Sequence, residues 1–136
     1  MSHPRVGYCT NVHPGLSLAE IREQLLRHAV PVREAVAPGG VLGLGLWLTE
    51  DVVGELADAE AAARFLEWLQ VRNLDVFTIN GFPQGDFHGT EVKHRVYTPD
   101  WADGRRRDYT MDLARVLAAW RPEGSSGSIS TLPVGW

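Results

Sequence analysis

The sequence predicts an α/β fold made of about four parallel βα units, the N-terminal half of an eight-stranded (β/α) barrel. Short apolar runs alternate with segments of helical spacing in the order β-α-β-α-β-α-β, which favours a parallel sheet with right-handed crossovers. Three predicted strands end in a small polar residue followed by Pro and Gly, a turn that suits the carboxyl-end rim of a barrel. The structural alternative is an open, flavodoxin-like sheet. The Pro-Gly turns have an alternative explanation as well, since turns in general are rich in these two residues.

Chain length favours half of a barrel over a whole one. A complete eight-stranded barrel needs about 250 residues, whereas this chain has 136 and stops shortly after its fourth predicted strand. We therefore expect one incomplete domain spanning residues 1–136. A parallel sheet that stops there has open edges, so we expect the isolated chain to be marginally stable, to self-associate or to need a missing C-terminal half.

The first unit is predicted from an apolar strand and a capped amphipathic helix. Residues 6–10 are short and apolar and lie between prolines. Ser17 and Glu20 have the spacing of a capping box, in which each side chain accepts a hydrogen bond from the backbone amide of the other residue. One apolar stripe then follows at helical spacing, and Pro31 should bend or end the helix. The stripe consists of Leu18, Ile21, Leu25, Ala29 and Val32.

The second unit starts with a nearly continuous apolar run. Residues 41–48 read as a strand that is buried on both faces. Thr49 can cap a short helix through residue 56, and Asp58 or Ala59 can begin another. The predicted buried face of that second helix is Ala62, Phe65, Leu66 and Leu69.

The third and fourth strands flank a long loop and a long helix. Residues 74–79 are rich in β-branched and aromatic side chains and predict a strand. A loop follows to about residue 100, and a helix covers about residues 103–120. Its predicted buried face is Tyr109, Leu113, Val116, Leu117 and Trp120, while the run Arg105, Arg106 and Arg107 is predicted to be solvated. Residues 128–132 predict the last strand.

Composition excludes several classes of protein. The net charge is −4, from 13 basic and 17 acidic residues, so the chain lacks the basic surface of a nonspecific nucleic-acid binder. One cysteine, Cys9, rules out an internal disulfide framework and is predicted to lie in the core. No apolar stretch is long enough to span a bilayer, and the first residues do not resemble a signal peptide. A cytoplasmic protein is therefore expected.

Two histidines are the candidates for proton transfer or metal binding. His13 follows the first strand and should lie on the rim, where neutral imidazole could transfer a proton or bind a divalent ion. His88 lies in the long loop after the third strand, two residues from Asp86, a third possible ligand. Each could equally be an ordinary loop residue, and a metal site usually needs at least three protein ligands.

Other side chains near the predicted rim could bind a small metabolite. Asn11 and Asn80 end strands and could orient hydroxyl groups, although Asn also favours strand-end turns. Lys93 could pair with a phosphate or carboxylate, or simply be solvated. Trp47 and Phe82 could wall the apolar side of a pocket, or pack in the core.

Four long segments and several short ones resemble the metabolite traffic protein EboE family. The long segments are GYCTNVHPG (7–15), LGLGLWL (42–48), FTINGFP (77–83) and GSISTLP (127–133). Shorter matches are FHG (87–89), VK (92–93), VY (96–97) and PDW (99–101). The resemblance runs in order along nearly the whole chain and matches only the N-terminal part of longer family members.

The resemblance implies a TIM-barrel fold similar to the xylose-isomerase-like superfamily, which includes sugar-phosphate isomerases and epimerases. It implies a role in processing or trafficking a small metabolite. In such proteins a divalent ion (Zn, Mn or Mg) is held mainly by residues of later strands, so this half would supply pocket walls and one or two histidines. The alternatives are a noncatalytic metabolite-binding or carrier component, and a truncated fragment inactive alone.

Overall fold

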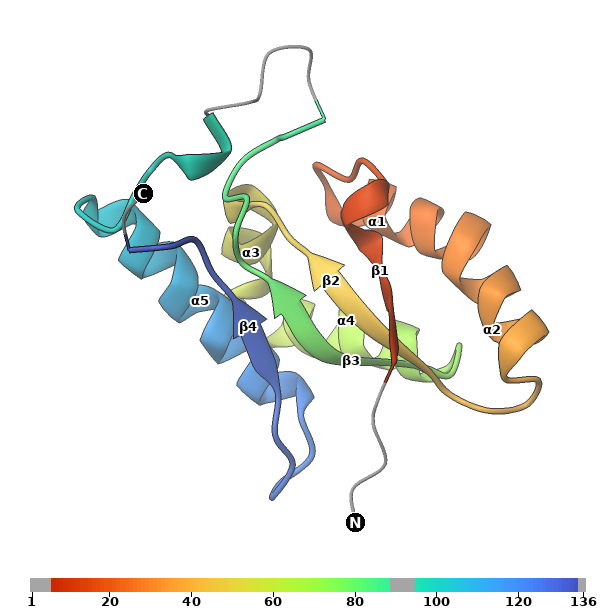
Figure 1. Cartoon of the computed structure of the whole chain (residues 1–136). Helices are drawn as coiled ribbons and strands as arrows, with labels where there is room; N and C mark the ends of the chain where they lie inside the picture. The colour runs from red at the N-terminus through yellow and green to blue at the C-terminus, as the bar shows by residue number, and fades with distance from the viewer. Residues whose placement is uncertain (1–5, 89–94, 135–136) are drawn as a thin grey trace.

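A computed structural model describes residues 6–88 and 95–134, and Figure 1 shows the chain with its sheet in front of the helices. Four parallel strands pair in sequential order, β1-β2-β3-β4. Their bounds are β1 (Gly7–Cys9), β2 (Leu42–Trp47), β3 (Leu74–Asn80) and β4 (Ser128–Ser130). The predicted α/β class and parallel sheet are confirmed. The sequential order differs from the 2-1-3-4-5 order of a flavodoxin-like sheet.

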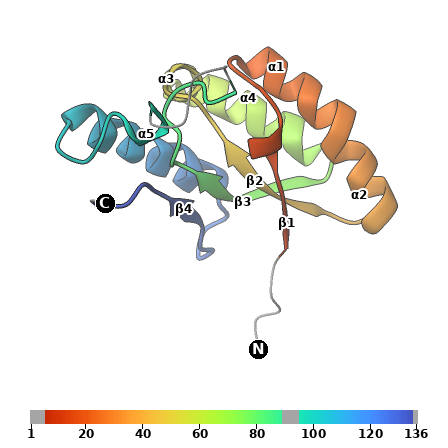
Figure 2. The same cartoon turned by 45° about the horizontal axis from the view of Figure 1, so that its top comes forward.

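The connections between these strands contain the helices. The first holds the 3₁₀ turn η1 (Thr10–Val12), α1 (Leu18–Gln24), the π-helical turn η2 (Leu25–Ala29) and α2 (Val30–Val36). The second holds α3 (Glu50–Leu56) and α4 (Ala59–Gln70), and the third holds η3 (Arg95–Tyr97) and α5 (Gly104–Trp120). Figure 2 shows α1 and α2 near one edge of the sheet, beside β1, and α5 near the other edge, beside β4.

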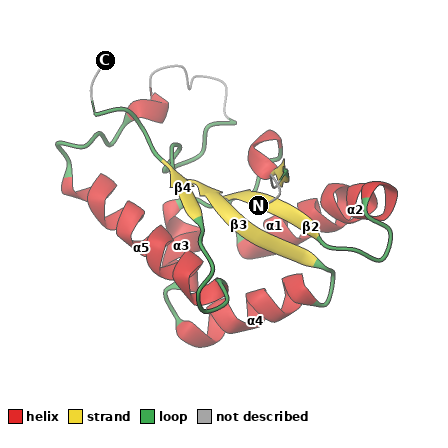
Figure 3. Cartoon of the chain, turned by 60° about the horizontal axis from the view of Figure 1, so that its bottom comes forward, coloured by secondary structure: helices red, strands yellow, loops and turns green. Residues whose placement is uncertain are grey.

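The helices lie along one side of the strands in the described part of the chain (Figure 3). Leu44 and Leu46 of β2 and Ile79 of β3 belong to the core between the sheet and the helices, and none of them has exposed surface. The predicted stripes of α4 and α5 pack on these strands, with Phe65 and Leu113 fully buried. Because the helices cover one face, the core is a single layer between sheet and helices.

Helix starts follow the capping residues that the sequence predicts. The side chains of Ser17, Thr49 and Asp58 accept hydrogen bonds from the backbone amides of Glu20, Val52 and Ala61. The Glu20 carboxylate accepts a hydrogen bond at 2.7 Å from the backbone amide of Leu16, one residue before the cap. The capping box is therefore present in a shifted form.

Pro31 does not end the first helix, which was one of the two outcomes predicted for it, the other being a bend. The helical path continues through α2, and the π-helical turn η2 ends two residues before the proline. A π turn shifts backbone hydrogen bonding from i−4 to i−5, so the wider turn makes room for a ring that an α-helix would clash with.

Cys9 is exposed, so the prediction that it lies in the core is wrong. It belongs to the three-residue strand β1, on the face turned away from the helices. Gly7, Gly43 and Phe77 lie on the same face, where the Phe77 ring covers both glycines: a Cβ placed at Gly43 would approach that ring to 2.7 Å. This second face explains why burial alternates along β1 rather than being complete.

Arg106 is fully buried, so only its two neighbours in the arginine run are solvated as predicted. Its guanidinium donates to the carbonyl oxygens of Pro99, Gly81 and Phe82 at 2.8, 2.9 and 3.0 Å. One turn later the Tyr109 hydroxyl lies 2.6 Å from the carbonyl oxygen of Leu48. The start of α5 therefore holds the loops after β2 and β3.

Among the described residues, no helix is long and apolar enough to cross a membrane.

Candidate functional site at the carboxyl ends of the strands

The candidate site lies at the carboxyl ends of the parallel strands, where the loops after β1, β2 and β3 meet. The backbone amide of Trp47, the last residue of β2, donates to the Thr10 hydroxyl at 2.9 Å. Its indole Nε1 donates to the Pro83 carbonyl at 2.9 Å. One buried tryptophan thus joins the loops that follow β1 and β3. This edge of a parallel sheet is where ligands bind in barrels and in open α/β sheets alike.

His13 lies between a tyrosine and a second histidine. The Tyr8 hydroxyl is 2.5 Å from His13 Nε2. The His13 and His28 rings stack with centroids 4.1 Å apart and an interplanar angle of 9°. His28 comes from η2 and had no predicted role. Its helical segment alone gave no sign of the stack, because the π turn that carries it is not evident from residue spacing.

The surroundings of His13 favour its neutral form. Partial burial, and then repulsion from His28 and His88, lower the pKa of His13 below its usual value. A neutral ring with Nε2 bonded to a hydroxyl can carry its proton on Nδ1 and donate it to a ligand oxygen.

This lowered pKa predicts how stability depends on pH. The folded chain binds the His13 proton less tightly than the unfolded chain does. The stability that neutral His13 contributes to the folded state is therefore complete above about pH 6.5 and is lost as the pH falls below that value. We expect the unfolding free energy of the His13→Gln variant to fall less on acidification than that of the wild type. Urea denaturation between pH 7.5 and 5 measures both slopes, and equal slopes would contradict the assignment.

An aromatic cluster covers Trp47 at the same edge. The Phe87 ring meets the Trp47 ring edge-on with centroids 4.7 Å apart, and the His88 ring lies 5.5 Å from it. His88 is exposed, so its ring borders solvent beside the cluster. The structure therefore brings the predicted residues His13, Trp47 and His88 into one neighbourhood, together with Phe87, which the sequence analysis did not single out.

The other predicted residues are arranged differently. Phe82 packs edge-on against Tyr97, at 5.3 Å between centroids, instead of against Trp47. The Asn80 side-chain oxygen accepts from the Phe82 amide and the Ser130 hydroxyl, which fits the turn role considered for it. Asn11 lies in η1, and its Oδ1 is buried without a hydrogen-bond partner among the described residues. Lys93 lies outside the described residues.

Two polar residues of the rim were missed by sequence analysis. Glu50 begins α3, three residues beyond β2. Its carboxylate accepts from Gln84 Nε2 at 2.6 Å. Gln84 sits in a Pro-Gln-Gly turn whose burial no local pattern indicates.

Two of the predicted metal ligands, His13 and Asp86, have hydrogen-bond partners within the described part of the chain. No group of three or more His, Cys, Asp or Glu side chains there could hold a metal ion. His13 Nε2 is bonded to Tyr8, and Asp86 Oδ1 accepts the His88 backbone amide at 2.9 Å. The described residues alone therefore do not make up a three-ligand site for a divalent ion.

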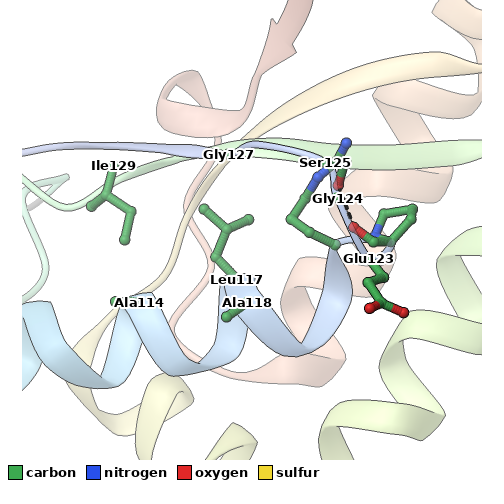
Figure 4. Close-up of a pocket in the computed structure, with 10 residues that line it drawn as sticks. Ala114, Leu117, Ala118, Glu123, Gly124, Ser125, Gly127 and Ile129 are labelled. Atoms are coloured by element: carbon green, nitrogen blue, oxygen red, sulfur yellow. Dashed lines mark hydrogen bonds between the residues drawn. The ribbon is translucent and has the colours of Figure 1, made fainter.

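A groove of about 510 Å³ lies between the end of α5 and the segment before β4, shown in Figure 4. Leu117, Ala118 and Ile129 line its apolar part, and Arg121, which also lines it, pairs with Asp75 at 2.7 Å. The groove is at the amino end of β4, opposite to the rim, so it is not the candidate site.

None of the family models, curated proteins or solved structures with which we compared the chain matches it.

Proposed function

We propose that this chain is the N-terminal part of a TIM-barrel protein whose rim binds a small polyhydroxy or phosphorylated metabolite. The observation that carries the proposal is the meeting of three βα loops around Trp47, with His13, Phe87 and His88 beside it. The sequential parallel sheet with helices along one side supports the barrel part, since a (β/α) barrel has this arrangement. Its place in the EboE-like family stays a prediction.

The chemistry of the rim suits recognition of such a ligand. Aromatic rings can cover the apolar face of a sugar-like molecule, and polar groups at their edge orient its hydroxyls. The lowered pKa of His13 favours a neutral imidazole, which can donate a hydrogen bond to a ligand oxygen or accept a proton from the ligand. This fits sugar isomerase or epimerase chemistry, in which a proton moves beside a carbonyl group. A carrier that only holds the metabolite would need the same walls without the proton transfer.

Two phenylalanines give a matched test of this site. We expect ribose 5-phosphate and xylitol to shift the Trp47 indole and His13 ring resonances of the chain in NMR titrations. Phe87→Ala should weaken binding roughly tenfold, because it removes an aromatic contact with Trp47. Phe82→Ala removes a ring packed on Tyr97 and should change affinity about twofold or less.

Three outcomes bear on the proposal. Saturable shifts with the expected ranking of the two variants support it. Binding that depends on Phe82 and not on Phe87 contradicts the site, and a Trp47 resonance that neither compound moves contradicts the function. The His13→Gln variant distinguishes an enzyme from a carrier. In a carrier, the variant keeps its ligand affinity within a few-fold of the wild type, whereas in an enzyme it also loses turnover.

A further inference from the structure

Gln84 is fixed by two hydrogen bonds to the start of α3. Its carbonyl oxygen accepts from the Glu50 backbone amide at 3.0 Å, and its side-chain Nε2 donates to Glu50 Oε2 at 2.6 Å. Only 3% of Gln84 is exposed. The side chain is therefore held in one orientation by the loop after β2.

This arrangement leaves the other end of the Gln84 amide without a partner. A carboxylate accepts hydrogen bonds and cannot donate them, so the amide must present its nitrogen to Glu50. Oε1 then faces away from Glu50, and it is buried with no hydrogen-bond donor among the described residues. An unsatisfied buried oxygen costs about 1–3 kcal/mol, so its persistence needs an explanation.

Gln84 also lines a hollow beside the aromatic cluster. The hollow has a volume of about 310 Å³ and is bordered by Asp86, Phe87, Arg95 and Thr98 as well. This volume lies at the lower end of the range for small-molecule sites. Phe87 lines the hollow and also contacts Trp47, so the hollow adjoins the proposed binding site.

We propose that Gln84 Oε1 is a specificity-determining acceptor for a hydroxyl group of the bound metabolite. This inference rests on the proposed function and identifies the ligand group that Gln84 recognises. Two acceptors, the Gln84 oxygen and the Asp86 carboxylate, border the hollow. Both oxygens favour a hydrogen-bond donor, whereas Asp86 and Arg95 bring opposite charges to the border of the hollow.

The expected discrimination is against a ligand that lacks this hydroxyl. A site built around a buried acceptor rejects a ligand without the matching donor, because the acceptor then stays unsatisfied after water is displaced. Xylitol and 1,5-pentanediol are a suitable pair of probes, since both have five-carbon chains and the second lacks the three inner hydroxyls. The Gln84 side-chain amide gives a direct NMR signal at the proposed contact.

We expect xylitol to shift the Gln84 amide resonances saturably in the full chain and 1,5-pentanediol to leave them in place. Gln84→Met should weaken xylitol binding at least roughly tenfold. Gln70→Met, at an exposed position of α4, is the matched control and should bind as the wild type does. The wild-type titration needs no variant, so it decides the matter even where Gln84→Met fails to fold.

The outcomes separate this inference from the proposed function. Shifts at Trp47 and His13 with a stationary Gln84 amide would overturn the inference and leave the rim site standing. A shift at Gln84 alone would support the inference and contradict the rim site. Equal responses to xylitol and 1,5-pentanediol, or equal xylitol affinity in Gln84→Met and wild type, would also overturn the inference.

Discussion

Replacing Arg106 by Met is expected to lower the unfolding free energy by about 3 kcal/mol or more. The variant keeps most of the side-chain volume and removes the guanidinium that donates to the carbonyls of Gly81, Phe82 and Pro99. Those oxygens would lose a charged donor at a position from which water is excluded, since Arg106 has no exposed surface. Guanidinium denaturation followed by circular dichroism measures the loss.

The neighbouring arginine supplies the control for this experiment. The Arg107 side chain is 71% exposed and pairs with Asp108 next to it at 2.7 Å. Arg107→Met should therefore change stability by less than about 0.5 kcal/mol. Equal effects of the two substitutions would mean that the buried guanidinium does not hold the loop. Binding should weaken along with stability in Arg106→Met, because Phe82 and Gly81 begin the loop that carries Phe87 and His88.

Truncating Phe65 to Ala is expected to cost about 3–5 kcal/mol. Its ring has no exposed surface. It stacks on Trp68 with centroids 5.9 Å apart and meets Trp120 at a tilt of 40° with centroids 5.6 Å apart. Trp120 is the last residue of α5, and its indole donates to the Ala62 carbonyl of α4 at 3.1 Å. Phe65 thus fills the junction between the two longest helices, and its loss would leave a cavity there.

Val71 is the control for Phe65. It follows the last residue of α4 and is 74% exposed, so Val71→Ala should change the unfolding free energy by no more than about 0.5 kcal/mol. Thermal unfolding should show Phe65→Ala melting well below both the wild type and Val71→Ala. A Phe65→Ala loss under about 1 kcal/mol would show that α4 and α5 repack around the missing ring.

Much of the candidate site could be placed from the sequence because parallel strands share a direction. His13 follows β1, Trp47 ends β2 and His88 lies beyond β3, so any sequential parallel sheet brings these residues to one edge. What the pattern could not show was which ring meets which. Phe82 and Phe87 lie in the same loop with similar surroundings in sequence, and only the path of that loop places Phe87 on Trp47 and Phe82 on Tyr97.

The sequence by itself determined the α/β class, the alternation of strands and helices, and the helix caps, since these depend on contacts between residues near in the chain. Only the tertiary structure decided the burial of Arg106 and Gln84, the stacking of His28 on His13 and the exposure of Cys9. Each of these depends on a partner distant in sequence or on which face of the sheet the helices cover. Local periodicity reports that a residue is polar or apolar, and the fold decides whether a polar one finds a buried partner.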